Sequence, residues 1–326
     1  MVAGEAGGAP STPGDGAGAP GRAAAARGAR RRAGVGTTRD AAIETAARRL
    51  EAAGVPGAGR DARLIARWAA GLGAAGLAAA GDRVMSKAEA RRFEAAVAER
   101  IRRRPLAQIT GRRLFWGFEF RVTPAVLDPR PESETLVAEA LALGPTLPAA
   151  PSVVDLGTGS GCLLISVLAG LPGARGLGID ASAAALAVAA ENAALAGLAG
   201  RTRFERGDWW SAATLSSGSV DLALCNPPYV SGAEIEGLDP EVRLFEPRSA
   251  LVPDPDPAGD GLGAYRAVLA GAGRYLAPGG WLVFEVGQAQ ANAVAGLAER
   301  AGLVDMSVRR DMNDHERVVM GRRQPR

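Results

Sequence analysis

Residues 153–161 read Val-Val-Asp-Leu-Gly-Thr-Gly-Ser-Gly, an apolar run that passes directly into a glycine-rich turn. An apolar segment with helical character follows at once, so the pattern predicts a buried strand, a tight turn and the start of a helix. In an α/β sheet, ligands bind beyond the carboxyl end of such a strand. We therefore expect a ligand to contact the turn, at Gly157, Thr158, Gly159, Ser160 and Gly161.

Short apolar segments alternate with helical segments after this turn. The helical segments include residues 183–196, and strands are expected at residues 153–156, 176–179, 220–225 and 281–286. Such alternation predicts an α/β fold with a doubly wound, mostly parallel sheet. The last strands, near residues 303–309 and 317–320, are expected to form an antiparallel pair at the sheet edge.

The chain in front of the sheet has three parts. Residues 1–36 are rich in Gly, Ala, Pro and Arg without apolar periodicity, which is typical of a disordered tail. Residues 37–104 have apolar residues at helical spacing, with Ser86 and Glu89 placed as a capping box, and predict a small helical domain. Residues 105–130 predict a β-hairpin linker, because apolar and polar residues alternate there. Residues 131–326 form the α/β domain.

Charge is unevenly distributed along the chain. Residues 37–104 contain fourteen basic and eight acidic residues, whereas residues 105–326 contain 19 basic and 25 acidic residues. An enzyme that acts on nucleic acid is expected to have a broad basic surface, and the acidic α/β region does not suggest one. We therefore expect no direct contact with nucleic acid.

Several classes of site are disfavoured by composition. His315 is the only histidine, and Cys162 and Cys225 lie far apart, so we expect neither a metal site nor a disulfide. No apolar run reaches the ~20 residues that cross a bilayer. We expect a cytoplasmic protein without membrane contact, and a monomer.

Acidic residues at the next two strand ends predict a nucleoside site. Asp180 ends the second strand, where a carboxylate can accept hydrogen bonds from both hydroxyls of a ribose. Asp208 and Trp209 follow the third strand, where a carboxylate can accept from an adenine amine and an indole can cover the purine. The Gly-x-Gly-x-Gly spacing differs from the dinucleotide fingerprint, so a pyrophosphate site is disfavoured. The alternative is that the glycines only make a turn and that each acid only caps a loop.

The segment Asn226-Pro227-Pro228-Tyr229 follows the strand at residues 220–225. Two consecutive prolines fix the backbone and remove its donors, so carbonyl oxygens are presented rigidly. The Asn226 side-chain carbonyl and the Pro227 carbonyl can accept the two hydrogens of an NH₂ group, while Tyr229 packs on the planar group. These features favour methyl transfer from S-adenosylmethionine to an amide-like nitrogen; a plain Asn-Pro-Pro turn is the alternative.

The chain resembles the release factor glutamine methyltransferases, the PrmC or HemK family, over about residues 40–323. Besides the glycine loop and residues 226–229, the matching segments are residues 104–111, 115–116, 129–134, 245–251, 285–288 and 316–319. The resemblance implies a Rossmann-like methyltransferase domain with a seven-stranded sheet behind a helical domain.

The resemblance also implies a reaction. The methyl group goes from S-adenosylmethionine to the side-chain amide of the glutamine in the GGQ motif of class-1 peptide release factors. By analogy, residues 157–161, Asp180, Trp209 and Asn226 contact the cofactor, residues 226–229 receive the glutamine, and the helical domain grips the release factor. Phe115 and residues 130–134 are expected to close over the site.

Three other functions remain open. A DNA adenine methyltransferase uses the same Asn-Pro-Pro-Tyr chemistry on a flipped base, but it needs a basic groove and a target-recognition domain. A methyltransferase for another protein glutamine would differ only in its docking surfaces. A cofactor-binding module without catalysis is a third alternative, against which the intact Asn-Pro-Pro-Tyr segment argues.

Overall fold

The computed structural model describes residues 36–325. The chain divides after Val97 into a front unit, which contains residues 36–97 of the described chain, and an α/β unit, which contains residues 98–325. The predicted disordered tail, residues 1–36, lies outside the described residues except for Gly36.

The front unit is built from helices. They are α2 (Arg39–Ala52), α3 (Ala58–Ala70), α4 (Ala74–Ala79) and most of α5 (Lys87–Ile101). Their buried faces carry the large apolar residues that the helical spacing predicts, including Leu50, Ile65 and Phe93. Trp68, on α3, is 36% exposed although it is a large apolar residue.

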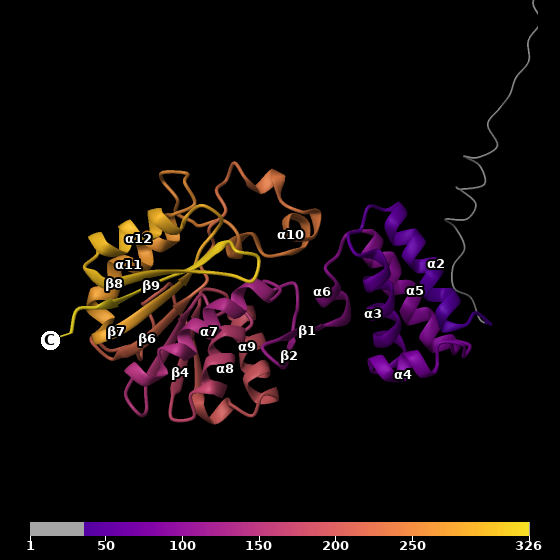
Figure 1. Ribbon diagram of the computed structural model, residues 1–326, viewed down its shortest axis with the longest axis horizontal. Coiled ribbons are helices and arrows are strands. Elements are labelled where there is room, and N and C mark those ends of the chain that lie inside the picture. Colours follow the sequence, from indigo (N-terminus) through magenta and orange to yellow (C-terminus); the bar gives the residue numbers. More distant parts are fainter. Residues whose placement is uncertain (1–35, 326) are drawn as a thin grey trace, which may run out of the picture. The chain divides into compact units, whose positions relative to one another are not determined.

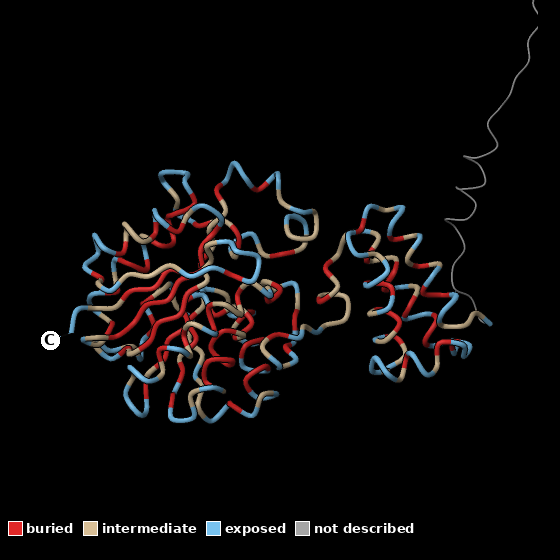
Figure 2. The backbone as a smooth tube through the Cα atoms, in the orientation of Figure 1, coloured by how far each residue is buried: buried red, intermediate tan, exposed pale blue. Residues whose placement is uncertain are grey.

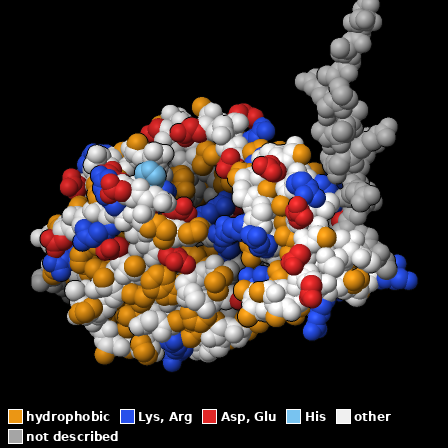
Figure 3. All heavy atoms as spheres, turned by 45° about the vertical axis from the view of Figure 1, so that its right-hand side comes forward, with side chains coloured by type: hydrophobic (Ala, Val, Ile, Leu, Met, Phe, Trp, Pro, Cys, Tyr) orange, Lys and Arg blue, Asp and Glu red, His pale blue; other side chains and the backbone are white. Residues whose placement is uncertain are grey.

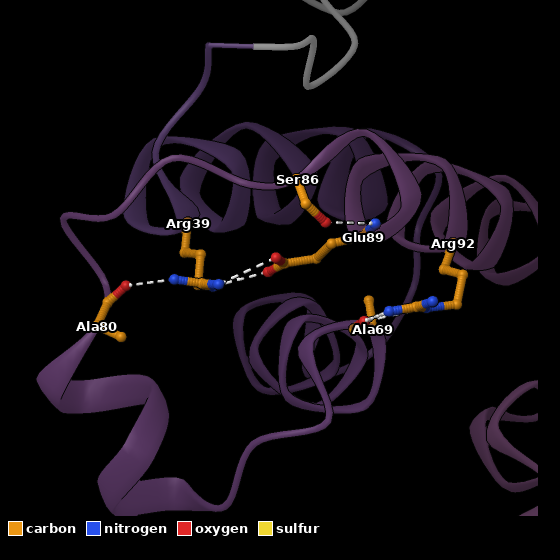
Figure 4. A network of polar contacts seen from close by, with 6 residues as sticks. All are labelled: Arg39, Ala69, Ala80, Ser86, Glu89 and Arg92. Atoms are coloured by element: carbon orange, nitrogen blue, oxygen red, sulfur yellow. Dashed lines mark hydrogen bonds and ion pairs between the residues drawn. The ribbon is translucent and has the colours of Figure 1, made fainter.

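Arg39 and Glu89 join two of these helices through a nearly buried ion pair (Figure 4). The guanidinium donates to both carboxylate oxygens, at 2.7 and 3.0 Å. Ser86 Oγ accepts from the backbone N–H of Glu89 at 3.2 Å, so this half of the predicted capping box is present. The Glu89 carboxylate pairs with Arg39 on α2, because a guanidinium offers charged donors that a helix-end amide does not.

A β-hairpin lies near the start of the α/β unit, after α6 (Leu106–Thr110). Its strands, β1 (Arg112–Phe115) and β2 (Phe118–Arg121), pair antiparallel. The two turn residues, Trp116 and Gly117, have φ values of 48° and 78°. Positive φ at both positions is the geometry of a type I′ turn, whose twist matches that of the strands.

The α/β unit contains a seven-stranded sheet with the order β5-β4-β3-β6-β7-β9-β8 (Figure 1). The strands are β3 (Ser152–Leu156), β4 (Arg175–Asp180), β5 (Thr202–Arg206), β6 (Val220–Cys225), β7 (Leu276–Glu285), β8 (Leu303–Arg310) and β9 (Glu316–Arg323). The five strands from β5 to β7 are parallel, and β9 runs antiparallel to β7 and β8. The predicted doubly wound, mostly parallel fold is confirmed; of the predicted edge pair, β8 forms the edge and β9 lies inside it.

Helices pack on both faces of this sheet, and the central strands β3, β6 and β7 are mostly buried between them (Figure 2). One apolar core contains residues of α11 (Gly263–Tyr275) and α12 (Ala291–Arg300). The other contains residues of α7 (Glu134–Ala142), α8 (Cys162–Gly170) and α9 (Ala183–Leu195). A short helix, α10 (Pro240–Phe245), lies in the long connection between β6 and α11.

The register places the carboxyl ends of the parallel strands at one edge of the sheet. Leu156 pairs with both Ile179 and Cys225, and Cys225 pairs with Phe284. Residues that directly follow these strands, among them the glycine turn and Asn226, therefore lie next to one another.

Surface side chains of the protein are mixed in type. Figure 3 shows acidic, basic and hydrophobic side chains all reaching the face that it draws. The large hydrophobic residues that are more than half exposed in the α/β unit, Leu114, Leu195, Leu244 and Met312, come from separate segments of the chain. Single exposed apolar residues of this kind are normal on a folded surface.

Candidate active site

A cavity of about 520 Å³ lies at the carboxyl edge of the parallel strands. Its wall contains the glycine turn, the ends of β4, β5 and β6, and two further segments, residues 124–130 and residues 247–254. Small-molecule sites have volumes of roughly 300–1,000 Å³. The cavity therefore has room for a ligand of nucleoside size.

The glycine turn is fixed by backbone hydrogen bonds. The amides of Gly157 and Thr158 both donate to the carbonyl of Ile179, at 2.9 and 3.0 Å. Gly157 has a φ of 75°, in the left-handed region that favours glycine. A Cβ at this position would lie 3.8 Å from the indole of Trp209, so its absence keeps that part of the cavity open.

Gly161 has a different role from the rest of the turn. It does not line the cavity, and it directly precedes α8. A Cβ there would lie 3.1 Å from side-chain carbons of Ala189 and of Ile165, so glycine allows close packing behind the turn. Gly157, Thr158, Gly159 and Ser160 do line the cavity.

Asp180 connects the end of β4 to the glycine turn. Its carboxylate accepts from the backbone N–H of Gly159 at 2.9 Å and from that of Ser182 at 2.8 Å. A carboxylate has about four lone-pair directions, so two remain for a ligand. Asp180 can thus hold the turn and accept from ligand hydroxyls at the same time.

Asp208 and Trp209 also line the cavity, at the end of β5. Asp208 is exposed, and its backbone N–H donates to Ser211 Oγ at 2.7 Å. Trp209 has a φ of 50°, which is unusual for a bulky residue. This conformation accompanies the approach of the indole to Gly157.

Asn226 and Pro228 line the same cavity as Gly159, whereas Pro227 and Tyr229 do not. Pro227 is buried, and the Tyr229 carbonyl accepts from the Gln290 side chain at 3.1 Å. Burial raises the pKa of Tyr229 to about 12, so the phenol is neutral at physiological pH. Pro227 and Tyr229 are thus outside the cavity wall, and the acceptor contacts expected of them remain predictions.

Two buried acids near the cavity were not predicted from the sequence. Asp155 is fully buried in β3, and Thr158 Oγ1 donates to it at 2.7 Å. Burial raises its pKa to about 7, an effect that the Thr158 hydrogen bond opposes. An acid inside an apolar strand is a signal that could have identified Asp155.

Glu285, at the end of β7, is the second buried acid. Burial raises its pKa to about 7, and a hydrogen bond with the Ser133 side chain opposes that shift. Ser133 Oγ lies 3.5 Å from Asn226 Nδ2. The group Asn226, Ser133 and Glu285 comes from three segments far apart in the sequence.

Residues 130–134 contribute to the cavity, but Phe115 does not. Arg130 and Ser133 line it. Phe115 is 1% exposed and packs edge-to-face on Phe120, with ring centroids 6.0 Å apart. The expectation that Phe115 closes over the site is wrong, because its ring is part of an apolar core.

The donor set of the cavity fits S-adenosylmethionine. Carboxylates stand at the ends of β4 and β5, an indole lies near the turn, and the turn leaves space where side chains would otherwise be.

None of the described helices is long and apolar enough to cross a membrane. Among residues 36–325, no group of three or more His, Cys, Asp or Glu side chains could hold a metal ion.

Comparisons with known proteins agree with this geometry. Residues 41–111 match the PrmC N-terminal domain family, and residues 149–309 match a methyltransferase domain family. The release factor glutamine methyltransferase of Cereibacter sphaeroides is 48% identical over 86% of this chain and 97% of its own length. This chain belongs to the release factor glutamine methyltransferase family.

Other members are similarly close. The release factor glutamine methyltransferase of Rhodospirillum rubrum is 43% identical over 86% of this chain and 84% of its own length. That of Caulobacter vibrioides is 42% identical over 85% of this chain and 93% of its own length. As a member of this family, the chain is an S-adenosylmethionine-dependent methyltransferase.

Proposed function

We propose that this enzyme transfers a methyl group from S-adenosylmethionine to the side-chain amide nitrogen of the glutamine in the GGQ motif of class-1 peptide release factors. The observation that carries the proposal is the common cavity of Asn226 and the glycine turn. A donor bound at the turn and an acceptor bound at Asn226 would face each other without an intervening protein layer. Curated relatives with this activity in their names support the choice of acceptor.

The chemistry explains why carbonyl oxygens suit the acceptor site. An amide nitrogen is a poor nucleophile, because its lone pair is delocalised into the carbonyl. Accepting both amide hydrogens, at Asn226 Oδ1 and the Pro227 carbonyl, would hold the NH₂ plane and aim its lone-pair face at the methyl donor. Orientation of this kind can supply a large part of a rate enhancement without a strong base.

The proposed roles divide between two ends of the cavity. The cofactor would supply an electrophilic methyl group on a sulfonium and leave as the thioether S-adenosylhomocysteine. The amide nitrogen would gain the methyl group and lose one proton to solvent, so the proposed step needs no metal. We assign cofactor contacts to Gly157, Thr158, Gly159, Ser160, Asp180, Asp208, Trp209 and Asn226, with Gly161 supporting the turn. The acceptor contacts are those of Asn226, Pro227 and Pro228, with Tyr229 supporting them.

The partner of the proposed reaction is the GGQ domain of a release factor. We assign its docking in part to the helical domain predicted at residues 37–104, which contains fourteen basic and eight acidic residues. The enzyme is proposed to work as a monomer, in the cytoplasm, where release factors act, and without direct contact with nucleic acid.

Transfer to an adenine amine or to another protein glutamine is the competing function. The Asn-Pro-Pro-Tyr segment would serve both, since each acceptor presents a planar NH₂ group. An excess of acidic residues after position 104 gives no support to a nucleic-acid substrate.

A labelling experiment tests the proposal. The purified enzyme and radiolabelled S-adenosylmethionine are incubated with a class-1 release factor, or with the same factor carrying alanine in place of the GGQ glutamine. We expect label on the first protein and none on the second. Equal labelling of both, or labelling of duplex DNA instead, would contradict the proposed acceptor.

A further inference from the structure

Arg130 is the only lysine or arginine among the described residues that line the cavity. The other charged residues of the wall are Asp180, Asp208 and Asp254. The proposed roles use Asp180 and Asp208 but leave the arginine without a function. A cation that faces a small-molecule cavity calls for an anionic group on the ligand.

The guanidinium of Arg130 is held from one side by a buried acid. Its Nη2 donates to both oxygens of Glu246 at 2.7 Å, and the Glu246 side chain has 0% exposure. Within residues 36–325, Nε and Nη1 have no hydrogen-bond partner, and the Arg130 side chain is 32% exposed. Three N–H donors are therefore available on a guanidinium whose position is already fixed.

Arg130 stands at the acceptor end of the cavity. It directly precedes a 3₁₀ turn (Pro131–Ser133), and its carbonyl accepts from the Ser133 backbone N–H at 3.1 Å. Ser133 in turn lies 3.5 Å from Asn226. The turn that carries Arg130 is thus next to the end of β6.

Strand order gives the direction in which the cofactor lies. The ends of β5 and β4 carry the proposed adenine and ribose contacts, and β3 and then β6 follow in the sheet. In the proposed orientation, the nucleoside of the cofactor lies at β5 and β4, and its methyl group faces Asn226 after β6. Its amino-acid portion must therefore lie toward β3 and β6. That is the side on which Arg130 lies.

We propose that Arg130 binds the α-carboxylate of the methionine portion of S-adenosylmethionine. This inference rests on the proposed function, because the nucleoside contacts and the acceptor position fix the orientation of the cofactor. The charges are complementary: the ligand has one carboxylate beside an ammonium and a sulfonium, and the wall has one cation beside three acids. A charge-assisted hydrogen bond to a carboxylate is among the strong ones in proteins.

Binding of three ligands to the wild-type enzyme, measured by titration calorimetry, tests the inference without any protein substrate. The ligands are S-adenosylmethionine, its decarboxylated form, and 5′-methylthioadenosine, which lacks the whole amino-acid portion. We expect the decarboxylated form to bind about 10- to 100-fold more weakly than S-adenosylmethionine. Similar affinities for these two would overturn the inference.

Variants then assign the effect to Arg130. Arg130→Ala alone would leave Glu246 buried without its partner, so Arg130→Gln combined with Glu246→Gln is made as well. Both variants are expected to bind S-adenosylmethionine about 10- to 100-fold more weakly and to lose the preference over the decarboxylated form. Their affinity for 5′-methylthioadenosine should match that of wild type.

Arg266→Ala is the matched control. Arg266 also pairs with an acid, Asp260, through two hydrogen bonds of 2.8 and 2.5 Å, but it does not line the cavity. This variant should keep the wild-type preference for the carboxylate. A preference that survives in both Arg130 variants would overturn the inference and leave the proposed function standing, whereas failure of wild type to bind any of the three ligands would overturn both.

Discussion

Asn226 is a residue whose substitution should lower methyl transfer with little effect on stability. Its one side-chain hydrogen bond within the described residues, to Ser133, is 3.5 Å long, so removing it should cost little stability. Asn226→Ala removes one proposed acceptor contact, and loss of a comparable transition-state contact lowers kcat by roughly 100- to 1,000-fold. We expect that loss in a methyl-transfer assay, with a Tm change of only a few degrees.

The control for this variant is Asn292→Ala. Asn292 is an exposed residue of α12 that does not line the cavity, and its loss should leave turnover unchanged. Wild-type turnover in Asn226→Ala would contradict the proposed mechanism, because the segment would then act only as a turn.

Glu285 should make stability depend on pH. Burial raises its pKa from 4.5 to about 7, so between these pH values the unfolded chain releases a proton that the folded chain retains. The unfolded state then binds fewer protons, and the contribution of this residue to stability falls as pH rises, by roughly 3 kcal/mol in all. Glu285→Gln has no ionisable group at this position, so its stability should not show this decrease as the pH rises.

Denaturant unfolding at pH 5 and pH 8 measures the effect. The free energy of unfolding of Glu285→Gln minus that of wild type should be larger at pH 8 than at pH 5, because only wild type loses stability as the pH rises. Glu205→Gln serves as the control, because Glu205 is only partly buried and lies in the edge strand β5. A constant difference between Glu285→Gln and wild type at the two pH values would show that Glu285 is ionised throughout.

At the scale of elements, two of the three glycines of α11, Gly271 and Gly273, have opposite surroundings. A Cβ at Gly271 would lie 2.2 Å from the ring of Trp210, which donates to the Val268 carbonyl at 2.7 Å and stacks on Tyr275. Gly271→Ala should therefore destabilise the protein by about 1–3 kcal/mol, although alanine favours helices. Gly273 has nothing within 4 Å of the same position, so Gly273→Ala should stabilise by roughly 0.5–1 kcal/mol. Denaturant unfolding of the two variants compares the signs, and a gain from both would show that Trp210 moves freely.

The ion pair of α2 and α5 gives a second contrast between elements. Arg39 and Glu89 have side-chain exposures of 13% and 6%, whereas Arg48 and Glu44 have 63% and 71%. Removing one partner of a buried pair costs about 3–5 kcal/mol, and an exposed pair contributes at most about 1 kcal/mol. Hydrogen exchange in the full chain should show a large loss of protection in α2 and α5 for Glu89→Ala and almost none for Glu44→Ala. Equal losses would mean that the buried pair does not hold these helices together.

Local patterns explain which features could be predicted from the sequence. The strand and turn at residues 153–161 are encoded by adjacent residues, as are the strand ends at Asp180 and Asn226. The contacts of Ser133 with Asn226, and of Arg130 with Glu246, join segments about 93 and 116 positions apart. Only the completed sheet brings such segments together, so no local pattern predicts them. The role expected of Phe115 came from the family resemblance, which does not show that this ring packs in an apolar core.

At the scale of the whole molecule, ligand binding should protect one unit and not the other. All described residues that line the cavity lie between positions 124 and 254, inside the α/β unit. A ligand present at 100 times its Kd stabilises the state that binds it by about 2.7 kcal/mol. With saturating S-adenosylhomocysteine, amides of the glycine turn and of the ends of β4 and β6 should exchange much more slowly, while those of α2 and α3 should keep their rates. A comparable slowing in α2 and α3 would contradict this expectation, because stabilisation by the ligand would then have to extend beyond the unit that contains the cavity.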